Sequence, residues 1–318
     1  MVIADGGEFF GSVSGGCVEQ DVTRQAELVL QDGVPRVAGY SKVEDPELEV
    51  GLNCDGIIDL LLEPLTEELL SMLERPAQLT LLTRFRTVGE TEVADLEHRL
   101  VPNEELTGDA RHRTAFCRTS EAVDGEWIEI FEPRVPSPLF LIFGAGTVAY
   151  PLSTFGRAMG FRVVVADPRG TYAQADHFPD AHEVICAWPK DLPERLGTGD
   201  GGLGERAAVV SLTHEPRFED DLLRTLMTVP PPAYLGAMGK RERHREREAR
   251  QAASGFDLAK LPPVHTPIGL DLGGKAPEDI ALSIMAEIQA LRHGKTGEPL
   301  SERARDGDGF ARYVPGRQ

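Results

Sequence analysis

The chain has 318 residues, which is enough for two domains that each bury a core of their own. Charged residues make up 27% of it and the formal net charge is -19, so the chain lacks the positive field by which proteins attract nucleic acid. No stretch approaches the roughly 18 consecutive apolar residues of a membrane span. Neither nucleic acid nor a membrane is therefore expected as a partner.

The four cysteines form no CxxC pair, and nothing that precedes them resembles a signal peptide. We therefore expect a reduced, cytoplasmic protein. A structural zinc site has about four ligands at recognisable spacings. The first two cysteines have no paired histidines nearby, so zinc is not expected.

Residues 1–33 are predicted to form two short strands and a helix. The strands would be joined by a turn at Asp5-Gly6-Gly7, where glycine tolerates positive φ. Apolar residues then recur at helical spacing up to a stop at Asp32-Gly33; they are Val18, Val22, Ala26 and Val29.

Cys17 directly follows two glycines in the stretch GSVSGGCVEQDV, at the N-terminus of the predicted helix. The positive end of a helix dipole favours an anion by about 0.3–1 kcal/mol, so part of the thiol is expected as thiolate. A thiolate can bind a soft metal or carry a persulfide. The alternative is a small buried apolar side chain, which is how free cysteines often behave.

Cys54 lies on a second glycine-flanked loop, GLNCDG at 51–56, which leads into a predicted buried strand at 57–65. We expect this loop to bring Cys54 toward Cys17 in the fold. The alternative is again a structural, buried cysteine.

The segment that follows is predicted to contain a helix at 67–74, a strand at 78–85 and a hairpin with its turn at 123–126. The other two cysteines, Cys117 and Cys186, stand in apolar strand contexts. Both are expected to be structural.

From residue 139 onward, short apolar runs alternate with amphipathic helices. The segment before it, EPRVPSP, is rich in proline and predicts a linker. The runs occupy 139–143, 161–167, 183–188, 207–214 and 233–237, and a last helix begins at Pro277.

These patterns predict an α/β protein. Its C-terminal part, 138–293, would be a Rossmann-like nucleotide-binding domain whose parallel sheet has helices on both faces. Residues 1–137 would form a smaller α+β domain that bears the cysteines, and 294–318 a disordered polar tail.

A phosphate-binding loop is predicted at Gly144-Ala-Gly146-Thr-Val-Ala149, between a strand and a helix. Asp167 ends the next strand, about 20 residues on, where it would accept a hydrogen bond from a ribose hydroxyl and disfavour a 2′-phosphate. The alternative is that the glycines only allow close packing and that Asp167 caps a loop. Pro151 indicates a kinked or late-starting helix.

Two further loops carry candidate ligand-binding residues. Gly236 and Gly239 precede Lys240 and Arg241 in a turn that would bind an anion, although Arg243 onward is better explained as a solvated, salt-bridged helix face. The loop from His265 to Asp271 precedes the last helix, and these two residues would contact a ligand or simply belong to a loop.

The motifs, taken together and in order, resemble the XdhC/CoxI family of xanthine dehydrogenase accessory proteins over nearly all of residues 1–293. They are SGGCVE (14–19), GLNCDG (51–56), IFGAGTVA (142–149), VVADPR (164–169), LTHEPRFEDD (212–221), YLGAMGKRERH (234–244) and HTPIGLDLGGKAPEDIALSIMAEI (265–288). The chain departs from the family at Thr147, where many members carry His, and at Asp55, where Gly is common. Members usually begin some tens of residues earlier, so the N-terminal domain is expected to be incomplete.

The resemblance implies an accessory protein that binds molybdenum cofactor, either molybdopterin or its dinucleotide form, and supports replacement of an oxo by a sulfido ligand. The protein would deliver the cofactor to an apo molybdenum hydroxylase, with a cysteine desulfurase as a further partner and a homodimer as the assembly. Cys17 and Cys54 match the two cysteine motifs, and Cys17 is implied as a molybdenum ligand. The Gly144 loop is implied to hold a phosphate or dinucleotide.

Two alternatives remain open. In an NAD(P)-dependent oxidoreductase, Asp167 would select NAD and His265 would handle a proton. In a nucleotide-binding redox sensor, Cys17 would be an oxidisable switch. An accessory protein accounts for both the cysteines and the phosphate loop, so it is preferred to a stand-alone enzyme.

Overall fold

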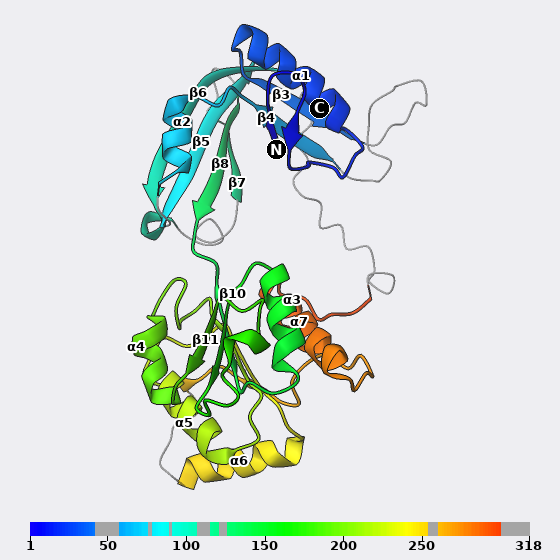
Figure 1. The fold of residues 1–318 in the computed structure, drawn as a ribbon. Coiled ribbons are helices and arrows are strands. Elements are labelled where there is room, and N and C mark those ends of the chain that lie inside the picture. The colour runs from blue at the N-terminus through cyan, green and yellow to red at the C-terminus, as the bar shows by residue number, and fades with distance from the viewer. Residues whose placement is uncertain are drawn as a thin grey trace. The chain divides into compact units, whose positions relative to one another are not determined.

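A computed structural model of the chain describes residues 1–41, 57–75, 78–88, 91–106, 115–120, 126–253 and 260–299. It divides the chain into two compact units, one within Met1–Val135 and the other beginning at Pro136 (Figure 1). The division falls inside the proline-rich segment in which the sequence predicts a linker. No helix of the described residues combines the length and apolar character needed to cross a bilayer.

The N-terminal unit contains an antiparallel pair of short strands and a six-stranded antiparallel sheet of order β4-β3-β6-β5-β8-β7. The pair is β1 (Val2–Ile3) and β2 (Phe9–Phe10). The sheet strands are β3 (Arg36–Tyr40), β4 (Ile58–Leu62), β5 (Leu79–Val88), β6 (Glu92–Pro102), β7 (Ala115–Ser120) and β8 (Glu126–Arg134). The described residues also form the helices α1 (Glu19–Asp32) and α2 (Glu67–Leu73).

Helix α1 forms where the sequence predicts it and ends at Gly33, whose φ of 71° terminates the helix in the left-handed region. Its apolar stripe packs on β3 and β4 in a small core formed by Val18, Val22, Val29, Tyr40 and Leu62. The strand predicted after Cys54 is β4, but only Leu62 of it is buried. It is less buried than predicted because it lies at the edge of the sheet.

The C-terminal unit is built on a six-stranded parallel sheet of order β11-β10-β9-β12-β13-β14. Its strands are β9 (Leu139–Phe143), β10 (Arg162–Asp167), β11 (Glu183–Cys186), β12 (Ala208–Ser211), β13 (Tyr234–Ala237) and β14 (Val264–His265). All five predicted apolar runs are strands. This is the doubly wound order of a Rossmann fold, whose topological switch point lies between β9 and β12.

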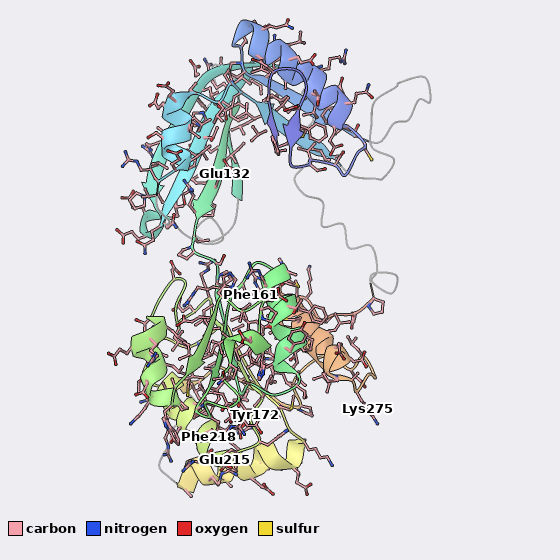
Figure 2. The ribbon with its side chains drawn as sticks, viewed as in Figure 1. Glu132, Phe161, Tyr172, Glu215, Phe218 and Lys275 are labelled. Carbon is pink, nitrogen blue, oxygen red and sulfur yellow. The ribbon has the colours of Figure 1, made fainter. Side chains whose placement is uncertain are left out.

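Helices cover both faces of this sheet, as predicted (Figure 1). They are α3 (Ala149–Ala158), α4 (Leu192–Leu196), α5 (Pro216–Leu226), α6 (Arg241–Ala253) and α7 (Pro277–Arg292). Residues of α3 and α7 share one core layer, to which Phe161 belongs, and residues of α4 and α5 share the other, to which Phe218 belongs (Figure 2). The sequence-based fold class is confirmed.

Pro151 is the third residue of α3. The first four N–H groups of a helix have no partner within it, so a proline at this position removes no hydrogen bond. The helix starts five residues after Gly144, which agrees with the late start that Pro151 indicates.

Candidate functional site

The loop after β9 has the geometry of a phosphate-binding turn. Gly144 is buried with φ of 106°, and a Cβ atom there would lie 2.9 Å from the backbone nitrogen of Thr213. A side chain is therefore excluded both by the dihedral angle and by the loop that follows β12. Gly144 fixes the turn at the switch point of the sheet.

Gly146 has the opposite surroundings. It is exposed, and a Cβ atom there would find nothing within 4 Å. Ala149 is fully buried where α3 meets the sheet. The loop thus leaves open space beside Gly146 at the N-terminus of α3, where backbone N–H groups and the helix dipole favour a phosphate.

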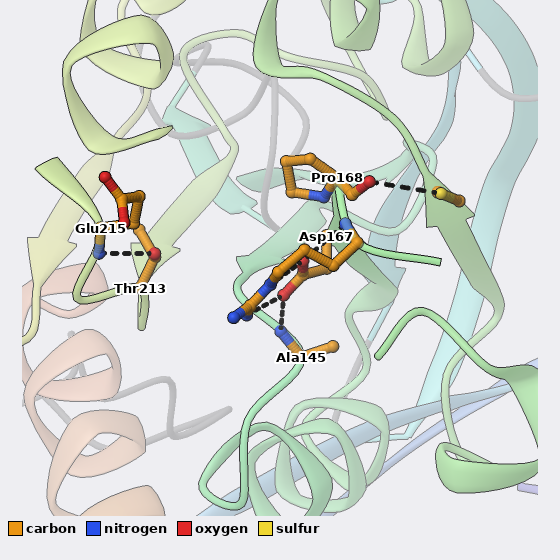
Figure 3. A network of polar contacts seen from close by, with 7 residues as sticks. Ala145, Asp167, Pro168, Thr213 and Glu215 are labelled. Atoms are coloured by element: carbon orange, nitrogen blue, oxygen red, sulfur yellow. Dashed lines mark hydrogen bonds and ion pairs between the residues drawn. The ribbon is translucent and has the colours of Figure 1, made fainter. Parts of the chain in front are cut away.

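Asp167 ends β10 next to this loop, and its side chain is saturated by the protein's own donors. The Ala145 N–H donates to Oδ2 over 3.0 Å, and the Arg169 guanidinium donates to both carboxylate oxygens over 2.8–2.9 Å (Figure 3). Burial disfavours the carboxylate, but the hydrogen bonds from Arg169 and Ala145 outweigh it and lower the pKa of Asp167. Recognition of a ribose by Asp167 stays a prediction, and a ribose would compete with Arg169.

Arg169 is a site residue that the sequence analysis did not single out. Its guanidinium lies 3.8 Å from the centre of the Tyr172 ring, and Tyr172 lies on the loop after β10 (Figure 2). Across the switch point, the Glu215 N–H donates to Thr213 Oγ1 over 3.1 Å (Figure 3). The motif VVADPR could have identified Arg169 as a partner of Asp167, because the residue after Asp-Pro is placed to fold back on the aspartate.

Cys17 lies on a loop that wraps around one carboxylate, that of Glu19. Gly15 and Gly16 take φ values of 76° and 115°, which turn the chain so that its N–H groups converge. Glu19 accepts hydrogen bonds from the hydroxyls of Ser12 and Ser14 and from the N–H groups of Val13, Ser14, Gly15, Gly16 and Val18, at distances of 2.5–3.3 Å. The two glycines before Cys17 allow the backbone to turn around the Glu19 carboxylate.

Glu19 is almost fully buried, at 7% exposure. Hydrogen bonds from the Ser12 and Ser14 hydroxyls, followed by that from the Ser14 N–H, hold the pKa of Glu19 well below its usual range. Glu19 is a residue that the sequence motifs did not single out. The signal was an acidic residue in the first turn of a helix directly after a Ser- and Gly-rich loop.

The Cys17 thiol is exposed, so the alternative of a buried apolar side chain is wrong. The Cys17 N–H donates to Ser14 Oγ over 2.9 Å, which fixes the backbone beneath the thiol. The positive end of the α1 dipole was expected to favour a thiolate at Cys17, but the Glu19 carboxylate already occupies that end. Cys17 is left as an outward-facing thiol on a fixed loop.

The other cysteines have different outcomes. Cys54 lies outside the described residues, as does the side chain of Cys117. Cys186 was expected to be structural, but it is exposed, and its thiol donates to the Pro168 carbonyl over 3.6 Å (Figure 3). Cys186 is exposed because it is the last residue of the edge strand β11.

The turn after β13 combines two glycines with different roles. A Cβ atom on Gly236 would lie 2.4 Å from Ile268 Cδ1, so this glycine permits close packing, whereas Gly239 takes a φ of 140°. Helix α6 was expected to be a solvated, salt-bridged helix face from Arg243 onward. Arg247 does form an ion pair, with Glu219 over 2.5 Å, but it is not solvated, because both residues are only 1% exposed.

His265 and Asp271 differ in their surroundings. The His265 ring stacks on Tyr234 with 4.9 Å between centroids, and its Nδ1 lies 3.3 Å from Glu287 Oε1. Tyr234 also donates to Glu287, over 2.5 Å. His265 is therefore part of a polar cluster between β13, β14 and α7, whereas Asp271 is exposed on the loop before α7.

Within the described ranges, no group of three or more His, Cys, Asp or Glu side chains is arranged to hold a metal ion. The described residues offer one exposed thiol on the N-terminal unit and one open phosphate loop on the C-terminal unit.

Family models match both units. The model of the XdhC Rossmann domain matches residues 140–288, and that of the XdhC and CoxI family matches residues 1–41. Together they cover more than half of the chain.

Individual relatives match over most of their length. The chain is 27% identical to a probable xanthine dehydrogenase subunit from Bacillus subtilis, with 92% of this chain and 87% of that protein aligned. It is 23% identical to the molybdenum cofactor insertion chaperone PaoD from Escherichia coli, over 92% and 77% of the two chains. A crystal structure described as that of a xanthine dehydrogenase from Bacillus halodurans superposes with a TM-score of 0.71 at 26% identity, covering 92% of this chain and 86% of that one.

Proposed function

The chain belongs to the XdhC and CoxI family, and from this premise we propose that it is an accessory protein that binds molybdenum cofactor and delivers it to a molybdenum hydroxylase. Two relatives support the proposal, because one is named a molybdenum cofactor insertion chaperone and the other a probable xanthine dehydrogenase subunit. In this proposal residues 1–137 contact the metal end of the cofactor, and residues 138–293 hold its phosphate end.

The phosphate end fits the loop between β9 and α3. Gly146 leaves open space at the N-terminus of α3, and Gly144 lets the turn pack against Thr213. Backbone N–H groups at such a terminus bind the phosphate of molybdopterin or of its dinucleotide form equally well. The loop therefore accounts for binding without choosing between the two forms.

The metal end fits Cys17, and the single observation that carries the proposal is the exposed thiol on a loop fixed by Glu19. The cofactor, when bound, supplies molybdenum with its own dithiolene sulfurs. The chain supplies one further sulfur on a rigid support, which limits the conformational entropy lost when that sulfur binds a metal. Sulfuration, with sulfur delivered by a cysteine desulfurase, belongs to the same proposal.

The test replaces Cys17 by alanine in the full chain, produced in cells that make molybdenum cofactor. We expect the purified Cys17→Ala protein to lose most of the molybdenum that the unmodified protein retains. Molybdenum would be measured by inductively coupled plasma mass spectrometry and the pterin by fluorescence after oxidation. The matched control is Cys186→Ala, which removes the exposed thiol of the other unit.

Cys186→Ala should retain molybdenum at the level of the unmodified protein. Equal retention by Cys17→Ala and the unmodified protein would refute the role of Cys17. Absence of molybdenum from all three proteins would refute cofactor binding itself.

A further inference from the structure

A cavity of about 510 Å³ opens at the carboxyl ends of β12 and β13, on the C-terminal unit. Its walls come from the loop after β12, the first turn of α5, the turn after β13 and one face of α6. The lining residues are His214, Pro216, Gly239, Lys240, Glu242, Glu246 and Arg250. Neither the phosphate loop nor Asp167 lines it.

One wall of this cavity is α6, a helix whose position is not set by apolar packing. Helix α6, RERHREREARQAA, has no apolar stripe. It is held on α5 by the buried pair Arg247–Glu219 and by Arg250, whose Nε lies 3.3 Å from Asp220 Oδ2. A buried ion pair seldom adds stability over apolar residues of the same volume, so its contribution here is to fix the position of α6.

That position directs Glu242 and Glu246 to the cavity. The two residues are one helical turn apart and therefore lie on the same face of α6. Lys240 precedes the helix and His214 faces it from the loop after β12. The cavity thus presents two carboxylates, which only accept hydrogen bonds, beside several nitrogen donors.

The cavity adjoins the phosphate loop through two consecutive residues. Thr213 packs against Gly144, and His214, the next residue, lines the cavity. In a doubly wound sheet, each half binds one end of a dinucleotide-like ligand whose phosphates lie at the switch point. A ligand with its phosphate on the Gly144 loop and one end over β10 and β11 would extend its other end over β12 and β13, into this cavity.

We infer that this cavity binds the pterin end of the cofactor, an inference that rests on the function proposed above. The 2-amino-4-oxo edge of a pterin carries two adjacent N–H donors, which match the two oxygens of one carboxylate. Its 4-oxo oxygen and ring nitrogens accept hydrogen bonds, and Lys240 lines the cavity as a donor. A nicotinamide lacks that pair of adjacent donors, so the carboxylates favour a pterin over the nicotinamide of NAD.

The experiment uses 6-hydroxymethylpterin, which carries no phosphate, as a probe of the cavity and ADP as a probe of the phosphate loop. Both would be titrated into the full chain, with pterin fluorescence and calorimetry as readouts. The test variants are E242Q, E246Q and the double variant, in which an amide replaces each carboxylate at nearly the same volume. The matched control is E205Q, the same change at an exposed residue of the same unit that does not line the cavity.

We expect the double variant to bind 6-hydroxymethylpterin about tenfold or more weakly, because an amide can accept only one of the two hydrogen bonds. Its affinity for ADP should be unchanged, and E205Q should match the unmodified protein with both probes. Gly146→Val should show the reverse pattern, with ADP binding lost and pterin binding kept.

Unchanged pterin affinity in the double variant would overturn the inference, as would failure of the unmodified protein to bind the pterin. If the unmodified protein nevertheless retains molybdenum, only the pterin site is wrong and the proposed function stands. If it retains no molybdenum and binds ADP alone, the proposed function fails as well.

Discussion

Glu19 explains the local sequence around Cys17. The Glu19 carboxylate, at the start of α1, accepts hydrogen bonds from the loop Ser12–Val18. The two glycines of this loop provide the backbone angles that these hydrogen bonds require. The loop is therefore an anion-binding turn whose anion belongs to the protein. Cys17 itself is exposed on this loop.

Glu19→Gln should destabilise the N-terminal unit, because an amide nitrogen would face donors that now meet a carboxylate oxygen. The pKa of Glu19 in the folded protein lies far below its usual 4.5, so the ionised form stabilises the fold above pH 4.5, and this contribution is lost as the pH falls further. The difference in thermal midpoint between the unmodified protein and Glu19→Gln should accordingly be large at pH 7 and shrink below pH 4.5.

Glu27→Gln is the matched control for this measurement, since Glu27 is exposed on the same helix. Its thermal midpoint should follow that of the unmodified protein at every pH. If Glu19→Gln and Glu27→Gln melt together at pH 7, Glu19 does not organise the loop.

At the scale of single residues, sequence patterns located Cys17, Gly144 and Gly146 but not their partners. Glu19 and Arg169 fold back on their own neighbours, and neither periodicity nor motif spacing reports which side chain fills a turn. Cys186 was assigned from its apolar neighbours, whereas its exposure depends on its place at the end of an edge strand.

Among the elements, the loop between β9 and α3 is the one on which the proposed phosphate binding depends. Its two glycines differ: Gly144 has positive φ and no room for a side chain, while Gly146 has open space and φ outside the left-handed region. The first should therefore be required for folding and the second for binding.

Gly144→Ala should lower the free energy of unfolding by about 1–3 kcal/mol, the usual cost of a side chain in a strained backbone region. Gly146→Ala should change it by less than about 0.5 kcal/mol, as is usual for exposed positions. Urea denaturation followed by circular dichroism would measure both. Similar losses of stability in the two variants would contradict the assignment of their roles.

The strands and long helices were predictable because each buries a regular apolar pattern. All five apolar runs of the C-terminal unit are strands, and α1 and α7 form at the positions that their patterns indicate. Helix α6 shows the limit of that approach, because its buried contact is an ion pair with α5. A charged sequence does not reveal which of its charges will lose contact with water.

For the whole molecule, the proposed function assigns the molybdenum of the cofactor to the N-terminal unit and its phosphate to the C-terminal unit. The family models match each unit separately, and the structure gives each its own core. The parallel sheet was predictable as a whole from its alternating pattern, whereas the Cys54 loop lies outside the described residues.

The most direct test is a crystal structure of the full chain isolated with its cofactor, in which anomalous scattering locates the molybdenum. We expect one cofactor molecule with its molybdenum at bonding distance from the Cys17 sulfur and its phosphate against Gly146 at the start of α3. A cofactor whose molybdenum lies away from Cys17, or whose phosphate lies away from that loop, would contradict it.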